Sequence, residues 1–193
     1  MKQSFTAHAF PVRLAFVGAL SAGLLLPGVT GAALKTDPAA STVSVQFKQL
    51  NVPVEAKFKK INAQIDYDTA RPNMAKASID IDITSFDLGD PDYNKEVLKK
   101  EWFDAAQFPK ATFVSSAIAS SGAGKLTVSG KLTLKGKTAE VSFPLSVKQQ
   151  AGRQVFDGVL PIRRTLFNIG DGEWKDTSVV ADEVVIRFHV VAS

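Results

Sequence analysis

Cysteine is absent from this chain of 193 residues, and histidine occurs only at His8 and His189. Without cysteine the protein can form no disulfide, no thiol nucleophile and no thiolate metal site. With so few histidines, no Ser-His-Asp grouping can be recognised, and no pair of carboxylates stands out as a glycosidase would require. We therefore predict a protein that is not an enzyme, with no catalytic residue and no metal site.

Charges of one sign are also not clustered in any part of the sequence. The chain carries 23 basic and 19 acidic residues, and two of the basic ones, Lys2 and Arg13, lie near the N-terminus. The remaining basic residues are scattered, as on a solvated surface, and no aromatic residues are interleaved with them in a patch. The composition therefore argues against nucleic acid as a partner.

The apolar run near the N-terminus is too short to span a bilayer. It extends from Leu14 to Leu26, about 13 residues, whereas a transmembrane helix needs roughly 20. Pro27–Gly28 breaks the run, and small residues follow, as before a signal-peptidase cleavage site. We predict a cleaved signal peptide over residues 1–33 and a single exported domain over residues 34–193, located in the periplasm.

Most of the chain alternates apolar and polar residues, as strands with one buried face do. The clearest case has Ile79, Ile81 and Ile83 on one face and Asp80 and Asp82 on the other. The two carboxylates are therefore predicted to face solvent rather than to act as an acid/base pair. Similar segments cover residues 43–47, 54–58, 61–67, 111–118, 126–134, 141–147, 155–162 and 184–191. Eight or nine antiparallel strands joined by short turns predict a sandwich or a closed barrel.

Three positions predict breaks within or between these strands. Pro53 indicates a strand start or an edge, because proline cannot donate to a ladder. Gly130 indicates a bulge or a bend, and Lys135–Gly136–Lys137 indicates a tight hairpin connection.

Residues 98–113 depart from the alternation. Residues 92–94 offer helix-starting caps and Pro109 ends any helix, so we predict a short helical insertion. The insertion carries three large aromatic side chains, Trp102, Phe103 and Phe108. They are too apolar to leave exposed, so they form either a plain lid over the core or a lid over an apolar ligand cavity.

Residues 163–182 are the second departure. Gly170 and Gly172 allow positive φ, but no Lys-Ser/Thr follows them, so the segment is not a phosphate loop. Three acidic residues between positions 171 and 176 have a spacing that calcium could use, but no EF-hand pattern is present. Trp174 is predicted to be a hydrophobic plug or a ligand-contacting ring.

Several motifs, each weak alone, form a specific set together. They are Trp102-Phe103-Asp104, Phe108-Pro109, Phe113, Val128 to Gly136, Phe167 to Gly170 and Val184 to Phe188. In these motifs the sequence resembles the YceI-like family of exported lipid-binding proteins. The resemblance implies an all-β fold, a single eight-stranded antiparallel lipocalin-like barrel with a short helical insertion. A barrel of about eight strands can hold one ligand inside it.

The resemblance also implies a function. We expect a periplasmic carrier that holds a long-chain isoprenoid lipid, such as a quinone, or a similar amphiphile in an apolar cavity, with no other cofactor. The alternative is a structural or partner-binding barrel with a filled core. A transient membrane or membrane-protein partner and a homodimer are both left open. The candidate ligand-binding residues are Phe47, Ile81, Ile83, Trp102, Phe103, Phe108, Phe113, Leu132, Phe143, Phe167 and Trp174.

Overall fold

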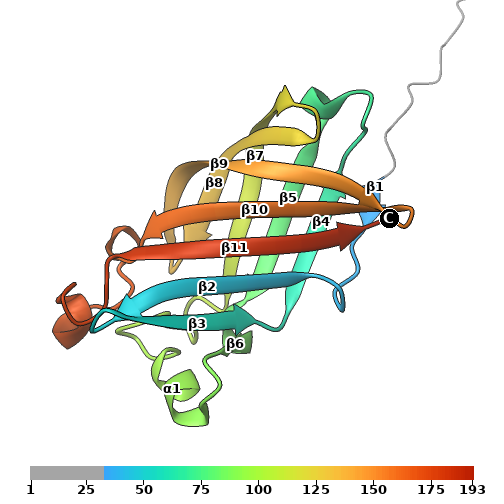
Figure 1. Cartoon of the computed structure of the whole chain (residues 1–193). Coiled ribbons are helices and arrows are strands. Elements are labelled where there is room, and N and C mark those ends of the chain that lie inside the picture. Colours follow the sequence, from blue (N-terminus) through green and yellow to red (C-terminus); the bar gives the residue numbers. More distant parts are fainter. Residues whose placement is uncertain (1–32) are drawn as a thin grey trace, which may run out of the picture. The chain divides into compact units, whose positions relative to one another are not determined.

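The computed structural model describes residues 33–193, which form one antiparallel sheet (Figure 1). Its strands are β1 (Ala33–Lys35), β2 (Thr42–Gln49), β3 (Val52–Phe58), β4 (Ile61–Asp66), β5 (Lys76–Asp82), β6 (Phe86–Asp87), β7 (Lys110–Gly122), β8 (Lys125–Leu134), β9 (Lys137–Gln150), β10 (Arg153–Arg163) and β11 (Glu183–Ala192). The strand order is β1-β4-β5-β7-β8-β9-β10-β11-β2-β3-β6. The helical elements are α1 (Pro91–Glu96) and the 3₁₀ turns η1 (Pro72–Met74), η2 (Ile83–Ser85), η3 (Arg164–Phe167) and η4 (Gly172–Lys175).

The all-β barrel class predicted from the sequence is confirmed, but the prediction of eight strands was wrong, since the sheet has eleven. The surplus comes partly from β1 and β6, which are only three and two residues long. An alternation of period two cannot be recognised in so few residues, and only pairing with β4 and β3 defines them as strands.

Two-residue turns set the register of three hairpins. The turns at residues 50–51, 135–136 and 151–152 have φ between 48° and 79° at both central positions. Such turns match the right-handed twist of the strands that they join. The hairpin predicted at Lys135–Gly136 is therefore confirmed, whereas the turn at Leu50–Asn51 gave no signal because leucine is unusual with positive φ.

The two ends of the sheet come together because β3 runs directly into β4. At this link the Lys59 amide donates to the Ser85 carbonyl, and the Asp82 amide donates to the Lys60 carbonyl, both at 3.1 Å. On the other side of β4, β1 also contacts the end of β11, where Lys35 and Ser193 exchange backbone hydrogen bonds of 2.8 and 3.0 Å. The sheet therefore curls round on itself.

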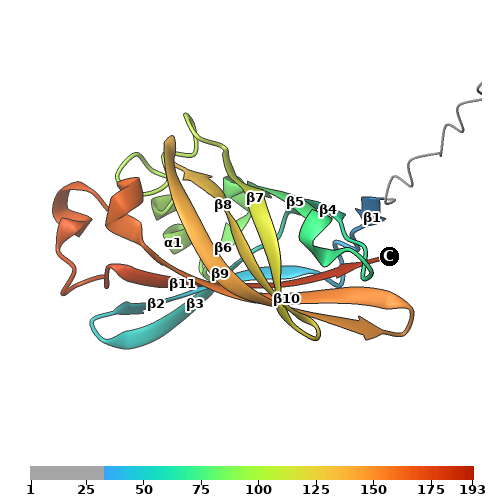
Figure 2. The same ribbon diagram turned by 90° about the horizontal axis from the view of Figure 1, so that it is seen from above.

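The wall is interrupted between β9 and β10. These strands pair only over Leu145–Gln150 and Arg153–Gly158, and beyond that point they diverge (Figure 2). Pro144 directly adjoins the last pair, and Pro161 lies further along β10, on the two strand segments that have separated. Proline lacks the N–H that a continuing ladder would need, so the sequence fits a split at this point.

Glycine permits close packing of phenylalanine rings inside the wall. A Cβ at Gly158 would lie 2.1 Å from Cε2 of Phe188, and one at Gly130 would lie 2.7 Å from Cζ of Phe113. Strand β8 runs unbroken through Gly130, and the irregularity lies instead in the facing strand β7, as a register shift between Ser115 and Ala117. Each glycine thus makes room for an aromatic ring over the backbone.

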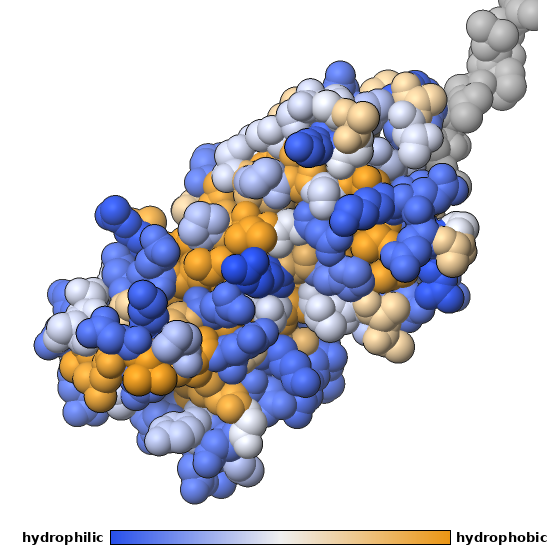
Figure 3. All heavy atoms as spheres, viewed as in Figure 1, coloured by the Kyte–Doolittle hydropathy of each residue, from blue (hydrophilic) through white to orange (hydrophobic). Residues whose placement is uncertain are grey.

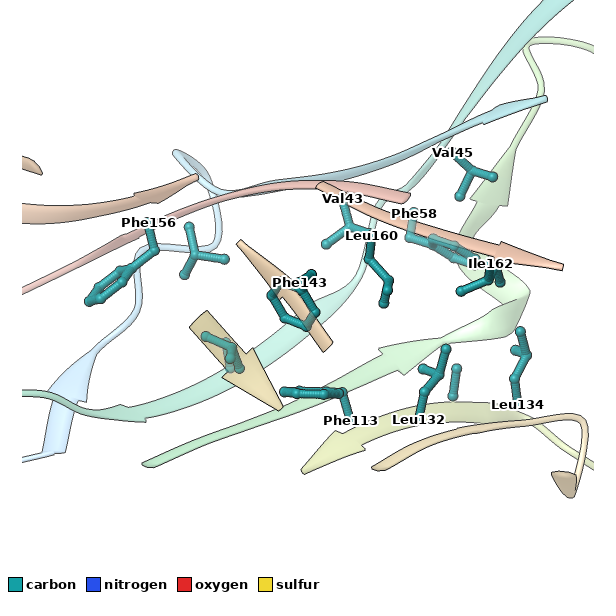
Figure 4. Packing of buried hydrophobic residues seen from close by; sticks show 14 of the residues in the cluster. Val43, Val45, Phe58, Phe113, Leu132, Leu134, Phe143, Phe156, Leu160 and Ile162 are labelled. Atoms are coloured by element: carbon teal, nitrogen blue, oxygen red, sulfur yellow. The ribbon is translucent and has the colours of Figure 1, made fainter. Parts of the chain in front are cut away.

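The core consists of side chains that point inward from opposite parts of the curled sheet (Figure 4). Ile79 and Ile81 pack against this core, as their parity predicts. Ile83 is only 1% exposed but lies just beyond β5, in η2. Asp82 caps η2, since its carboxylate accepts from the Thr84 amide at 2.9 Å. That carboxylate is thus engaged locally rather than simply solvated.

The helical insertion is present but shorter than expected. Helix α1 begins after Asp90, whose carboxylate accepts from the amides of the first turn, and it ends at Glu96. Residues 97–109 are turns, closed by bonds from the Phe103 amide to the Val97 carbonyl and from the Ala105 amide to the Leu98 carbonyl, both 3.0 Å. The prediction that a helix carries Trp102 was therefore wrong.

The predicted signal peptide lies outside the described residues, except for Ala33. Within residues 33–193, no helix is both long and apolar enough to cross a membrane.

Candidate functional site

An apolar cavity of about 490 Å³ occupies the half of the barrel beside α1, η3 and η4. Strands β2, β3, β5, β6, β7, β8, β10 and β11 form its wall, and residues 88–103 and 164–180 contribute from its open end. The apolar residues that line it are Val43, Val45, Phe47, Val54, Phe58, Ile81, Phe86, Leu88, Val97, Trp102, Phe103, Ala111, Leu132, Leu134, Ile162, Ile169, Trp174, Val180, Val184 and Ile186.

Three phenylalanines form one side of the cavity. Phe86 lies between Phe58 and Phe103, with ring centroids 4.9 and 5.1 Å away and the planes steeply tilted. Tilted pairs at these distances are favourable arrangements of aromatic rings. They attach the aromatic insertion to β3 and β6 and give the cavity a rigid apolar side.

Two tryptophans, one from each departure from the strand pattern, meet on another side. The ring centroids of Trp102 and Trp174 are 5.3 Å apart. The backbone ties the same two segments together, because the Gly170 and Asp171 amides donate to the Glu101 carbonyl at 2.9 and 2.8 Å. Two segments far apart in the sequence are thus joined to each other beside the open end of the cavity.

Arg164 holds the second of these segments in place. It is 2% exposed, and its guanidinium donates to five backbone carbonyls, those of Ile169, Gly170, Trp174, Val180 and Ala181, at 2.7 to 3.3 Å. Burial lowers the pKa of Arg164 from its ordinary value, and the nearby carboxylates of Asp182 and Asp171 oppose that shift. With all its donors used, Arg164 has none left for a ligand. The role of Arg164 could not be predicted from the sequence, because nothing local distinguishes this residue from the exposed Arg163 beside it.

The remaining polar groups of the cavity lie near its open end. They are Gln49, Asp90, Tyr93 and Glu96. Asp90 is engaged as the cap of α1, Glu96 pairs with Lys99, and Tyr93 is 63% exposed. The cavity therefore offers polar contacts at the rim and almost none within.

The predicted ligand-binding residues divide into three groups. Six line the cavity: Phe47, Ile81, Trp102, Phe103, Leu132 and Trp174. Two line a much smaller void of about 40 Å³ in the other half of the barrel: Phe113 and Phe143. Three line neither: Ile83, Phe108 and Phe167. Phe108 instead packs on the hairpin at Gly136, where a Cβ would lie 2.7 Å from its ring.

Aromatic rings fill that other half. Phe143 lies between Phe113 and Phe188, with ring centroids 5.6 and 4.9 Å away. The barrel is thus filled at one end and hollow at the other. It combines the ligand cavity of one alternative with the packed core of the other.

His189 lies away from the cavity. Its Nδ1 is 2.6 Å from Oδ1 of Asp157, and both side chains are substantially exposed, beside a shallow surface hollow. Residues 33–193 contain no group of three or more histidine, aspartate or glutamate side chains placed to hold a metal ion.

Sequence and structure comparisons agree with this architecture. The model of the YceI-like domain matches residues 34–192. The chain belongs to the YceI-like family. One similar protein of known structure is BcnA of Burkholderia cenocepacia, with 55% identity and a TM-score of 0.81 over 82% of this chain and all of that one.

More distant matches are found in sequence and in structure. The UPF0312 protein of Shewanella denitrificans is 30% identical in sequence, over 64% of the length of this chain and 67% of the length of that protein. A polyisoprenoid binding domain from Saccharophagus degradans, implicated in plant cell wall breakdown, is 19% identical, with a TM-score of 0.64 over 83% of this chain and 97% of that one. At that identity the likeness concerns the fold alone.

Proposed function

We propose that this protein binds the isoprenoid tail of a long-chain lipid in the cavity of about 490 Å³ and carries that lipid in the periplasm. The main support for this proposal is the presence of the cavity. Native cores are packed to high density, so a large apolar void beside a filled half is a costly feature for a purely structural barrel. Its volume lies within the roughly 300–1,000 Å³ typical of ligand pockets. The polyisoprenoid binding domain of Saccharophagus degradans, which shares the fold, also supports this ligand class.

Burial of the tail would supply most of the affinity. Each Å² of apolar surface removed from water contributes about 25 cal/mol, partly offset by the loss of ligand freedom. The rings of Phe113, Phe143 and Phe188 set the depth that the tail can reach. A tail longer than this space would fold back or extend from the open end.

The open end has features suited to collecting a lipid from a membrane. The hairpin between β2 and β3 exposes Leu50 and Val52, at 66% and 62%, and hydrophobic surface gathers at this end of the molecule (Figure 3). The Leu50 amide donates to the Val179 carbonyl at 2.8 Å, next to cavity-lining Val180. Leu50 also has a φ of 50°, which is unfavourable for a bulky residue. Exposure and backbone strain together favour a membrane contact for this tip.

Binding of a fluorescent long-chain isoprenoid probe to delipidated protein tests the proposal. Trp102→Ala should weaken binding by roughly 1–3 kcal/mol at a constant folded fraction, because a large apolar contact is removed. Phe108→Ala is the matched control, since it truncates an aromatic side chain of the same insertion outside the cavity. It should lower the melting temperature and leave binding by the folded protein unchanged.

Two further measurements address the carrier role. Mass spectrometry should find isoprenoid lipid co-purified from the periplasm, and the intact mass should place the N-terminus between Ala32 and Lys35. If the delipidated protein binds no long-chain probe, the carrier role fails and a partner-binding barrel takes its place.

A further inference from the structure

The cavity and the smaller void of about 40 Å³ lie next to each other along the barrel. On β5, Ile81 lines the cavity and Ile79, the next residue that faces inward, lines the void. The same step of two residues on β11 leads from Ile186 in the cavity lining to Phe188 in the void lining. The partition between the cavity and the void is therefore only about one side chain thick.

Three phenylalanine rings lie in this partition. Phe113, Phe143 and Phe188 all line the void, and Figure 4 places Phe143 and Phe113 between Phe156, at the far end, and Ile162, beside the cavity. Phe143 is the middle ring of the three, with centroid distances of 5.6 Å to Phe113 and 4.9 Å to Phe188. A tail that enters from the open end would therefore meet these rings before it could reach the void.

The outer two rings lie directly over the backbone of the wall. A Cβ on Gly130 would come within 2.7 Å of the Phe113 ring, and a Cβ on Gly158 would come within 2.1 Å of the Phe188 ring. No side chain at either glycine separates these rings from the sheet, so both occupy space close to the wall. Phe143, which is only 5% exposed, fills the space between them. It is therefore the ring that closes the middle of the barrel.

We infer that Phe143 determines the length of isoprenoid tail that the protein selects, because its ring closes the inner end of the cavity. This inference rests on the proposed function and narrows its ligand class to tails that fill the cavity as far as this ring. A shorter tail buries less apolar surface and binds more weakly. The units of a longer tail that do not fit remain in water and add no burial, since a ring packed at core density does not make room without cost. Affinity should therefore rise with tail length and then level off.

A series of isoprenoid alcohols from farnesol to solanesol, which differ by whole isoprene units, tests this inference. Affinity is measured by displacement of the fluorescent isoprenoid probe from delipidated protein and is expressed per folded molecule. In the wild type, each added unit should tighten binding by about tenfold or more until the tail reaches Phe143, and by less than about twofold beyond that length. Phe143→Ala should move this limit to a tail longer by about one unit or more, and it should bind the shorter alcohols as the wild type does.

Two further variants control for a loss of stability. Phe156 is 4% exposed and borders the void on the side away from the cavity, so Phe156→Ala removes a buried ring without opening the partition. This control should leave the limit of tail length unchanged. Phe143→Leu keeps an apolar side chain and should destabilise the fold less than Phe143→Ala. It should admit part of the next unit, which should then tighten binding by about threefold.

The outcomes separate this inference from the proposed function. A limit that stays unchanged in both Phe143→Ala and Phe143→Leu overturns the inference while lipid binding stands. The same holds if Phe156→Ala moves the limit as far as Phe143→Ala does. A wild type whose affinity continues to rise as far as solanesol also overturns it, because the tail then passes the ring. If no alcohol binds to the folded wild type, the proposed function fails and the inference fails with it.

Discussion

Replacing Arg164 by methionine should destabilise the protein through the loop at the open end of the cavity. Methionine has a similar length but no donors, so it would leave five carbonyls of residues 169–181 without the bonds that they now accept. Hydrogen bonds to charged groups contribute roughly 1.5–3 kcal/mol each, but they are not additive, and removal of the buried cation relieves its desolvation. We therefore expect a net loss of about 3–5 kcal/mol in the free energy of unfolding.

The measurement is urea unfolding followed by tryptophan fluorescence, because Trp102 and Trp174 both lie at this loop. Arg163→Met is the matched control: the neighbouring Arg163 is exposed, so its loss should cost less than about 0.5 kcal/mol. Arg164→Lys, which keeps the charge but offers fewer donors in a different geometry, should fall between them. If Arg164→Met and Arg163→Met unfold at the same urea concentration with equal slopes, the role assigned to the buried guanidinium is wrong.

Three other changes test the architecture. Gly158→Ala should lower the stability measured in a thermal melt by several kcal/mol, because its Cβ would lie 2.1 Å from the Phe188 ring. In the control Gly152→Ala the new Cβ meets no atom, so the variant should lose only about 1 kcal/mol through its positive φ. Similar losses of stability in the two variants would contradict the packing described. Ile81→Asp should abolish or strongly weaken folding, since it places a charge in the apolar lining, and a normal melting temperature would show that the inward face is misassigned. The Lys59 ammonium and hydrogen bonds from Asn94 and Gly89 hold the pKa of Asp87 far below its usual range. The ionised Asp87 therefore stabilises the folded protein above the pKa that this carboxyl has in the unfolded chain, and this stabilisation is lost on acidification. Asp87→Asn should therefore reduce the fall in melting temperature between roughly pH 5 and pH 2, and an unchanged pH profile would refute this linkage.

Local patterns predicted the parts of this fold that depend on local geometry. The parity of Ile79 and Ile81 gave their inward face, and Lys135–Gly136 gave a hairpin, because both features arise from adjacent residues. The family resemblance added the barrel class. Neither the local patterns nor the family resemblance could predict the number of strands, because β6 is a strand only through its pairing with β3.

The division between filled and hollow halves could not be read from the sequence. Phe47 and Phe143 both alternate correctly for an inward face, yet the first lines the large cavity and the second packs among other rings. The difference depends on which strands lie opposite, a non-local property. Arg164 was missed for the same reason, since its five acceptors come from a loop that wraps around it only in the folded chain.

The pairing of Lys35 with Ser193 has a consequence for the order in which the sheet folds. Strand β11 spans ten residues and lies between β10 and β2, so it joins early and late parts of the domain. Hairpins such as β8–β9 can form from neighbouring residues, but the circle closes only when β11 has paired with β2. Contacts of such long sequence separation form slowly. Closure of the circle is therefore expected to follow the formation of the local hairpins.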